Sequence, residues 1–231
     1  MRHRLVLFDI DGTLLDTGGA GGAALLDAAE EVFGLPRTHF PPLDLAGATD
    51  GGVIRKLFFD AGHPLETAKT GVFREAYLRR LRTHLHHESF RGRLLEGVLE
   101  LLAKLATHDG YSVGLLTGNL RRGATLKLER FEIAHHFRDG GFGDDAEDRN
   151  HLGPVAVQRM EEKIGKRFSP EDVVVIGDTP KDIACAHAMG ARCLAVATGQ
   201  FDSASLSAGG AWLTLADLGD TDGVMAALDA S

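Results

Sequence analysis

Two aspartates, Asp9 and Asp11, follow directly on the first apolar run of the chain, Leu5–Phe8. Carboxylates one residue apart repel each other unless a cation lies near them, and a divalent cation with oxygen ligands relieves that repulsion. A carboxylate is also able to attack phosphorus and form an aspartyl-phosphate. A surface turn rich in Asp and Gly is the alternative, but the buried strand expected before Asp9 favours a functional site.

A third aspartate, Asp178, closes another apolar run, Val173–Ile176, after one glycine. Thr179 then suits the N-cap of a helix, and Asp182 falls at the third helical position. A capping box or the helix dipole alone would explain Asp182. Asp178 precedes the cap residue and has no such structural role, which makes it the stronger candidate for chemistry.

The carboxyl ends of parallel strands meet at one edge of a sheet, where ligands of open α/β folds bind. We therefore expect Asp9, Asp11 and Asp178 to converge there. Mg²⁺ takes such carboxylates together with waters and a substrate phosphate. The sequence predicts a Mg²⁺ site formed by these three aspartates.

An anion site is predicted beside the carboxylates. Thr117, Gly118 and Asn119 follow the apolar run Ser112–Leu116 and open a helical pattern. Thr117 offers a hydroxyl, and backbone amides at a helix N-terminus favour an anion. Asn119 could instead be a simple N-cap. Both roles are compatible, because a cap and a phosphate compete for only some of the free amides.

An alternation of strand and helix patterns positions these residues. Short unbroken apolar runs, typical of parallel strands covered on both faces, occur at 5–8, 112–116, 173–176 and 194–197. Helical stripes lie at 94–106, 120–131 and 155–164, with the apolar spacing of amphipathic helices. The pattern predicts an α/β fold with a Rossmann-like parallel sheet core.

Residues 18–89 break this alternation. They show helical periodicity at 24–33, 53–59 and 72–85 and no convincing strand. We expect an all-helical cap at 18–89, inserted into a core formed by residues 1–17 and 90–231. Flexible connections are expected at the Gly-rich residues 18–22 and at the polar residues 89–93.

Three motifs resemble those of the haloacid dehalogenase superfamily in order, spacing and position at strand ends. They are Asp9-x-Asp11-Gly-Thr13, Thr117-Gly118-Asn119 and Gly177-Asp178-Thr-x-x-Asp182, which match motifs I, II and IV. The resemblance covers essentially the whole chain. It implies a parallel sheet with flanking helices, a mobile helical cap after motif I, and a Mg²⁺ cofactor.

The resemblance also implies roles for individual residues. Asp9 would be the nucleophile and Asp11 the general acid and base. Thr117 would bind the transferring phosphoryl group. Asp178 would ligate Mg²⁺, and Asp182 would support the shell around the metal.

Motif III departs from the family pattern, which has a Lys followed by prolines. Here Arg149 matches the Lys, and Pro154 matches a later proline. A guanidinium neutralises a phosphoryl oxygen and donates in a fork, so Arg149 is expected to serve, although Arg and Lys are not equivalent. A solvated Arg in a polar loop is the alternative.

The cap is expected to select the substrate. Thr49 and Arg55, with Asp50 between them, stand at the start of an expected cap helix and are candidate substrate-binding residues. Arg55 would face a phosphate or a carboxylate. A solvated helical Arg is an equally good interpretation of Arg55.

Composition excludes several classes of partner. Lys and Arg total 25 against 33 Asp and Glu, a formal charge of −8, which argues against nucleic acid and polybasic membrane binding. No apolar run reaches the roughly 18 residues of a membrane span. Cys185 and Cys193 match no metal or redox motif, so reduced thiols and a cytoplasmic location are expected.

These observations together predict a Mg²⁺-dependent hydrolase of a small organic phosphate monoester, acting through an aspartyl-phosphate. Phosphoglycolate phosphatase-like members are the nearest group by overall pattern. A phosphosugar mutase shares the same core motifs, and a non-catalytic phosphate-binding module is a further alternative. A dehalogenase is disfavoured because those enzymes lack the second Asp of motif I, which Asp11 supplies here.

Overall fold

The computed structural model describes residues 3–230 and contains a six-stranded sheet in which every neighbouring pair is parallel. The strand order is β5-β4-β1-β6-β7-β8. The strands are β1 (Arg4–Phe8), β4 (Tyr111–Leu116), β5 (Gly140–Gly141), β6 (Val173–Gly177), β7 (Arg192–Val196) and β8 (Leu213–Leu215). The predicted α/β class with a parallel sheet is confirmed.

Apolar side chains of the central strand β1 project from both faces of the sheet. Val6 and Phe8 join one buried cluster, whereas Leu5 and Leu7 join another. Each fully buried side chain of this kind contributes about 1.5–3 kcal/mol. The sheet is therefore the middle of three layers, and its unbroken apolar strands are the expected result of burial on both sides.

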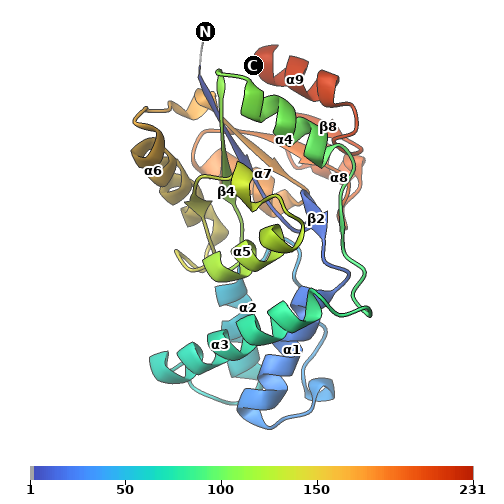
Figure 1. Cartoon of the computed structure of the whole chain (residues 1–231). Helices are drawn as coiled ribbons and strands as arrows, with labels where there is room; N and C mark the ends of the chain where they lie inside the picture. The colour runs from blue at the N-terminus through green and yellow to red at the C-terminus, as the bar shows by residue number, and fades with distance from the viewer. Residues whose placement is uncertain (1–2, 231) are drawn as a thin grey trace.

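Helices cover the two faces of the sheet (Figure 1). The first cluster is completed by α4 (Val98–Thr107), α5 (Arg121–Arg130) and α9 (Thr221–Ala230). The second is completed by α6 (Leu152–Ile164), α7 (Pro180–Ala188) and α8 (Ser203–Ala208). The short 3-10 helices are η1 (Arg37–His39), η2 (Ala134–His136), η3 (Arg149–His151) and η4 (Pro170–Asp172).

Residues 18–89 contain three α-helices: α1 (Ala20–Phe33), α2 (Asp50–Asp60) and α3 (Thr67–His84). They pack on one another around their own apolar cluster, in which Phe58, Phe73 and Tyr77 are fully buried. In Figure 1 these helices lie together at the end of the molecule away from the two termini. This cap is thus built on its own apolar cluster, which also includes Leu120 and packs against Leu126 of α5.

A short antiparallel ribbon joins the cap to the sheet. β2 (Leu15–Asp16) pairs with β3 (Arg93–Leu94) where the chain leaves and returns. The backbone is close here: a Cβ on Gly92 would lie 2.7 Å from the carbonyl oxygen of Asp16. The ribbon lies next to the two connections expected to be flexible: residues 18–22 follow β2 and lead into α1, and residues 89–93 lead into β3.

The apolar runs predicted the central strands well, but the edges of the sheet were missed. β5 is two glycines and β8 reads Leu-Thr-Leu beside a loop, so neither presents a long apolar run. Both are fixed by pairing with a neighbour rather than by propensity. Among the described residues no helix is long and apolar enough to cross a membrane.

Candidate active site

A cavity of about 400 Å³ lies between the carboxyl ends of the strands and the cap. The sheet side contributes polar residues that include Asp9, Asp11, Thr117, Gly118, Asn119, Arg149 and Asp178. The cap side contributes mainly small or apolar ones, among them Leu25, Ala48, Val53 and Tyr77. A wider depression of about 760 Å³ runs along α6 and contains none of the predicted site residues.

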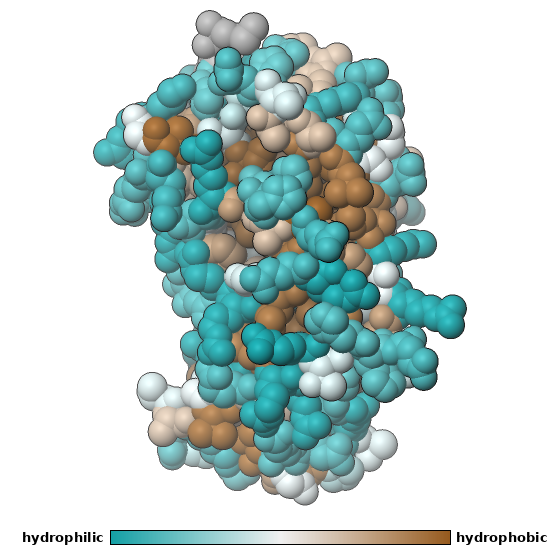
Figure 2. All heavy atoms as spheres, viewed as in Figure 1, coloured by the Kyte–Doolittle hydropathy of each residue, from teal (hydrophilic) through white to brown (hydrophobic). Residues whose placement is uncertain are grey.

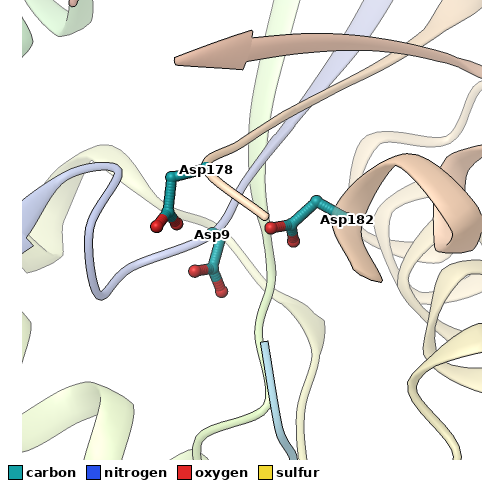
Figure 3. A group of neighbouring side chains, drawn as sticks. All are labelled: Asp9, Asp178 and Asp182. Atoms are coloured by element: carbon teal, nitrogen blue, oxygen red, sulfur yellow. The ribbon is translucent and has the colours of Figure 1, made fainter. Parts of the chain in front are cut away.

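Three buried carboxylates cluster at this cavity: Asp9 and Asp178 line it, and Asp182 lies beside them without lining it. Asp9 follows β1, Asp178 follows β6, and Asp182 lies in the first turn of α7 (Figure 3). One oxygen of each lies within 4.8 Å of the others, and all three residues are at most 4% exposed. Burial, followed by repulsion among these carboxylates, raises the pKa of Asp178. Burial likewise raises the pKa of Asp9, although Arg149 opposes the shift.

Neighbouring groups fix the orientation of Asp178 and Asp182. The Thr13 hydroxyl donates to Asp178 Oδ1 at 3.1 Å. The amide and hydroxyl of Thr179 donate to Asp182 Oδ2 at 3.0 and 2.7 Å. The capping box predicted from the sequence is therefore present. Asp182 also points its other oxygen at Arg149, so it combines a capping role with a place in the carboxylate group.

Arg149 is the cation of this group. It is 6% exposed and donates to Asp9 Oδ1 at 2.8 Å, to the Leu116 carbonyl at 3.2 Å and to Asp182 Oδ1. Burial alone would lower the pKa of Arg149, but Asp182 and Asp9 outweigh it and raise the pKa. The solvated-loop interpretation of Arg149 is therefore wrong, because the side chain is enclosed by two carboxylates.

Asp11 does not join the carboxylate group, and the predicted ligand set of Asp9, Asp11 and Asp178 changes accordingly. Its side chain is 42% exposed and accepts from Lys127 Nζ at 2.8 and 2.6 Å. Asn119 Nδ2 also donates to it, at 2.7 Å. The three carboxylates that the described residues bring together are instead those of Asp9, Asp178 and Asp182.

Lys127 was missed in the sequence, although a signal was present. Leu120, Ala124, Lys127 and Leu128 have the spacing of one helical face, and all four are buried. A lysine on an apolar stripe is a candidate for a buried ion pair.

The segment after β4 also differs from expectation. Thr117 is fully buried, and its hydroxyl oxygen accepts from Asn119 Nδ2 at 2.8 Å. Asn119 is not an N-cap, since α5 is preceded by Leu120 and shows no side-chain cap. The amides of Leu120 and Arg121 donate to Asp50 and Asp144. Two amides at the start of α5 are thus already satisfied by carboxylates.

Thr49 and Arg55 do not line the cavity, contrary to their predicted role in substrate binding. Thr49 caps α2 and donates to the Glu147 carbonyl at 2.8 Å. Arg55 forms a two-point contact with the Glu147 carboxylate at 2.7 and 2.6 Å. Both side chains join the cap to the loop before α6, because the start of α2 is turned toward that loop.

Asp50 is the charged cap residue that lines the cavity. Its amide donates to the Gly118 carbonyl at 2.7 Å, and its carboxylate accepts from the Leu120 amide at 2.8 Å. Burial raises the pKa of Asp50 to about 6, while Lys127 opposes the shift. Asp50 therefore ties the start of α2 to the start of α5, directly above the site.

Comparison with known proteins assigns the family. The model of the haloacid dehalogenase-like hydrolases matches residues 6–196, and the chain belongs to this family. It is 27% identical to phosphoglycolate phosphatase 1 of Pseudomonas aeruginosa, over 85% of this chain and 70% of that protein. It is 29% identical to the N-acetylmuramic acid 6-phosphate phosphatase of the same organism, over 86% of this chain and 84% of that protein.

Solved structures share the fold. A hydrolase from Pseudomonas syringae superimposes with a TM-score of 0.71 at 21% identity, covering 97% of this chain and 99% of that one. A likeness at this identity establishes the arrangement of strands and helices. The chemistry has to be argued from the side chains at the carboxyl end of the sheet.

Proposed function

We propose that this protein hydrolyses a small phosphate monoester with Mg²⁺, through a phosphoryl group carried on Asp9. The proposal rests mainly on the surroundings of the Asp9 carboxylate. Asp9 is a 4%-exposed carboxylate that lines a cavity at the end of β1, and Arg149 holds one of its oxygens. A fixed, desolvated carboxylate beside a cation is what attack on a phosphate dianion requires.

The donor set fits a hard divalent cation. Asp9, Asp178 and Asp182 offer clustered carboxylate oxygens, while Arg149 is the cation bonded to that group. Oxygen ligands of this kind suit Mg²⁺. Asp9 and Asp178 would hold the ion and Asp182 would support them, since both Asp182 oxygens are already hydrogen-bonded. When bound, Mg²⁺ offsets the repulsion between a carboxylate and a phosphate.

The first half-reaction moves the phosphoryl group to the protein. An Asp9 oxygen forms a bond to phosphorus as the bond to the ester oxygen breaks. Asp11, two residues on and facing the same cavity, gives a proton to the leaving oxygen. The Thr117 hydroxyl and Arg149 stand beside the phosphoryl position and bind its oxygens.

The second half-reaction frees Asp9. Asp11, now a carboxylate, takes a proton from a water as the water oxygen attacks phosphorus, and the bond to Asp9 breaks. Inorganic phosphate leaves, and Asp11 is again protonated for the next cycle. One carboxyl group therefore serves both steps, because each step ends with Asp11 in the state that the other needs.

The cap is proposed to act as a lid. Two exposed ion pairs join it to the sheet part, Arg55 with Glu147 and Arg122 with Glu75. They lie beside the Asp50–Gly118 hydrogen bond and the apolar contacts of Leu120 and Leu126 with the cap. Figure 2 shows hydrophilic side chains, with apolar patches between them, over the region where α3 meets α5. Exposed polar contacts of this kind contribute little each and break readily, which suits a cap that opens to admit substrate and water.

A screen of small phosphate esters tests the function. The protein should release inorganic phosphate with Mg²⁺ and stop when the metal is chelated. Phosphoglycolate and an amino-sugar 6-phosphate belong in the panel because relatives bear those names. Isomerised sugar phosphate without net release would identify a mutase instead. Binding of phosphate esters with no product of either kind would identify a non-catalytic module.

A further inference from the structure

Lys127 on α5 is a buried lysine with every proton assigned to an acceptor. It is 4% exposed, and its ammonium donates to both oxygens of Asp11, at 2.8 and 2.6 Å, and to Asn119 Oδ1 at 2.5 Å. A lysine ammonium has three donors and no acceptor. These three contacts therefore satisfy it completely and fix its position.

The Asp11 carboxylate is held in position by two neighbouring side chains and remains accessible from the cavity. Lys127 contacts both of its oxygens, and Asn119 Nδ2 donates to one of them at 2.7 Å. Asn119 is itself fixed, because its Nδ2 also donates to Thr117. The Asp11 side chain still exposes 42% of its surface and lines the cavity. The carboxylate is thus oriented without being shielded from a ligand.

The site contains two separate ion groups. Arg149 serves Asp9 and Asp182, whereas Lys127 serves Asp11. Packing alone does not require a cation at position 127. An apolar residue there, between Ala124 and Leu128, would avoid the free-energy cost of burying an ammonium. The cap covers Lys127 closely: a Cβ on Gly21 of α1 would lie 3.6 Å from its Nζ. A buried cation on the cavity wall is explained by what it does to Asp11.

We propose that Lys127 is a positioning residue that holds Asp11 in place for proton transfer in both half-reactions, with Asn119 as its partner. The inference rests on the proposed function of the site. It differs from the role of Arg149, which contacts Asp9. Loss of Lys127 should therefore impair the steps that need Asp11 and spare the attack by Asp9.

Leaving groups separate these steps. Nitrophenolate departs without a proton, whereas an alkoxide needs one. Lys127→Met should give a burst of nitrophenolate close to one equivalent of enzyme from p-nitrophenyl phosphate. Steady turnover should then be about 10²–10³-fold slower than wild type, the range for lost acid–base catalysis. With an alkyl phosphate the same variant should lose turnover by a similar factor and show no burst of alcohol.

A double-mutant cycle tests whether Lys127 acts through Asp11. Asp11→Asn should show the same burst and slow turnover. Adding Lys127→Met to Asp11→Asn should cost less than threefold more, because residues that act as a unit are not additive. Lys127→Arg should recover part of the rate. Lys163→Met, an exposed lysine on α6, is the matched control and should turn over at the wild-type rate.

Several results would overturn the role of Lys127. They are a raised KM with unchanged kcat, disappearance of the burst in a folded variant, or fully additive losses in the cycle. If Lys127→Met does not fold, Lys127→Arg replaces it in the cycle, because its guanidinium cannot reproduce all three contacts of one ammonium. A wild-type protein that hydrolyses neither ester contradicts the proposed function itself, and Lys127's role with it.

Discussion

At the scale of single residues, the site depends on how charge is compensated in a buried place. Arg149 contacts Asp9 and Asp182, and all three side chains are at most 6% exposed. Removing one member of such a group leaves a buried charge without its partner, which costs more than the group contributes when whole. Arg149 should therefore matter to folding as well as to turnover.

Arg149→Met tests this directly. The variant should lose turnover and about 3–5 kcal/mol of unfolding free energy, because Asp9 and Asp182 would face each other without a cation. Urea unfolding monitored by circular dichroism gives the stability. Arg149→Lys should retain more of both properties. Wild-type stability in Arg149→Met would mean that the two carboxylates are neutral in the folded protein.

The residues of the site were predicted unevenly, for physical reasons. Asp9, Asp178 and Arg149 were found because position at a strand end or in a motif is visible in the chain. The orientation of Asp11 toward Lys127 was not, since the direction of a side chain depends on a partner 116 residues away. Arg55 was misplaced for the same reason: Glu147, which it contacts, lies 92 residues along.

At the scale of elements, the start of α2 and the start of α5 lie in close contact. The Asp50 amide donates to the Gly118 carbonyl, and a Cβ on Gly118 would lie 1.9 Å from the Ala48 carbonyl oxygen. Only glycine allows this approach. The helices themselves were predicted from periodicity, but this contact and the β2–β3 ribbon were not, because each joins distant parts of the chain.

Gly118→Ala should therefore keep the cap from closing fully. We expect kcat/KM to fall about tenfold to a hundredfold, the equivalent of 1–3 kcal/mol of overpacking. The Asp50 amide should also exchange its hydrogen faster. Gly71→Ala on α3, where a Cβ would meet nothing within 4 Å, is the control and should leave kcat/KM unchanged. If the Asp50 amide of Gly118→Ala exchanges its hydrogen at the wild-type rate and kcat/KM is unchanged, the expected closure of the cap is contradicted.

Ionisation of Asp50 should make the stability contributed by this contact depend on pH. The folded-state pKa of Asp50, about 6, lies above the unfolded value of about 3.9, so the folded protein binds the proton more tightly. The contribution of Asp50 to stability is present below about pH 4 and is lost as the pH rises through about 6.

Asp50→Asn should remove this loss. Between about pH 4 and pH 7, its unfolding free energy should rise relative to wild type by on the order of 2 kcal/mol. Urea unfolding across that range is the measurement. Asp44→Asn, at an exposed site, should follow the wild-type curve. If the Asp50→Asn and wild-type curves run parallel, the carboxyl group of Asp50 is ionised throughout in the folded state.

At the scale of the whole molecule, two bodies built on different apolar clusters meet over one cavity. The sheet part supplies the carboxylates and cations, and the cap supplies Asp50 and an apolar wall. The fold class followed from the sequence because buried parallel strands have a distinctive composition. The contacts that join the two bodies did not, since they are scattered and link residues far apart in the chain.

The central claim is that Asp9 carries the phosphoryl group, and trapping that intermediate tests it most directly. Protein mixed with Mg²⁺ and p-nitrophenyl phosphate is quenched in acid, digested and analysed by mass spectrometry. Asp11→Asn, in which the second step is slow, should carry close to one phosphoryl group per chain on the peptide that contains Asp9. Asp9→Asn should carry none and turn nothing over. Near-wild-type turnover in Asp9→Asn, or a phosphoryl group on another residue, would contradict the mechanism.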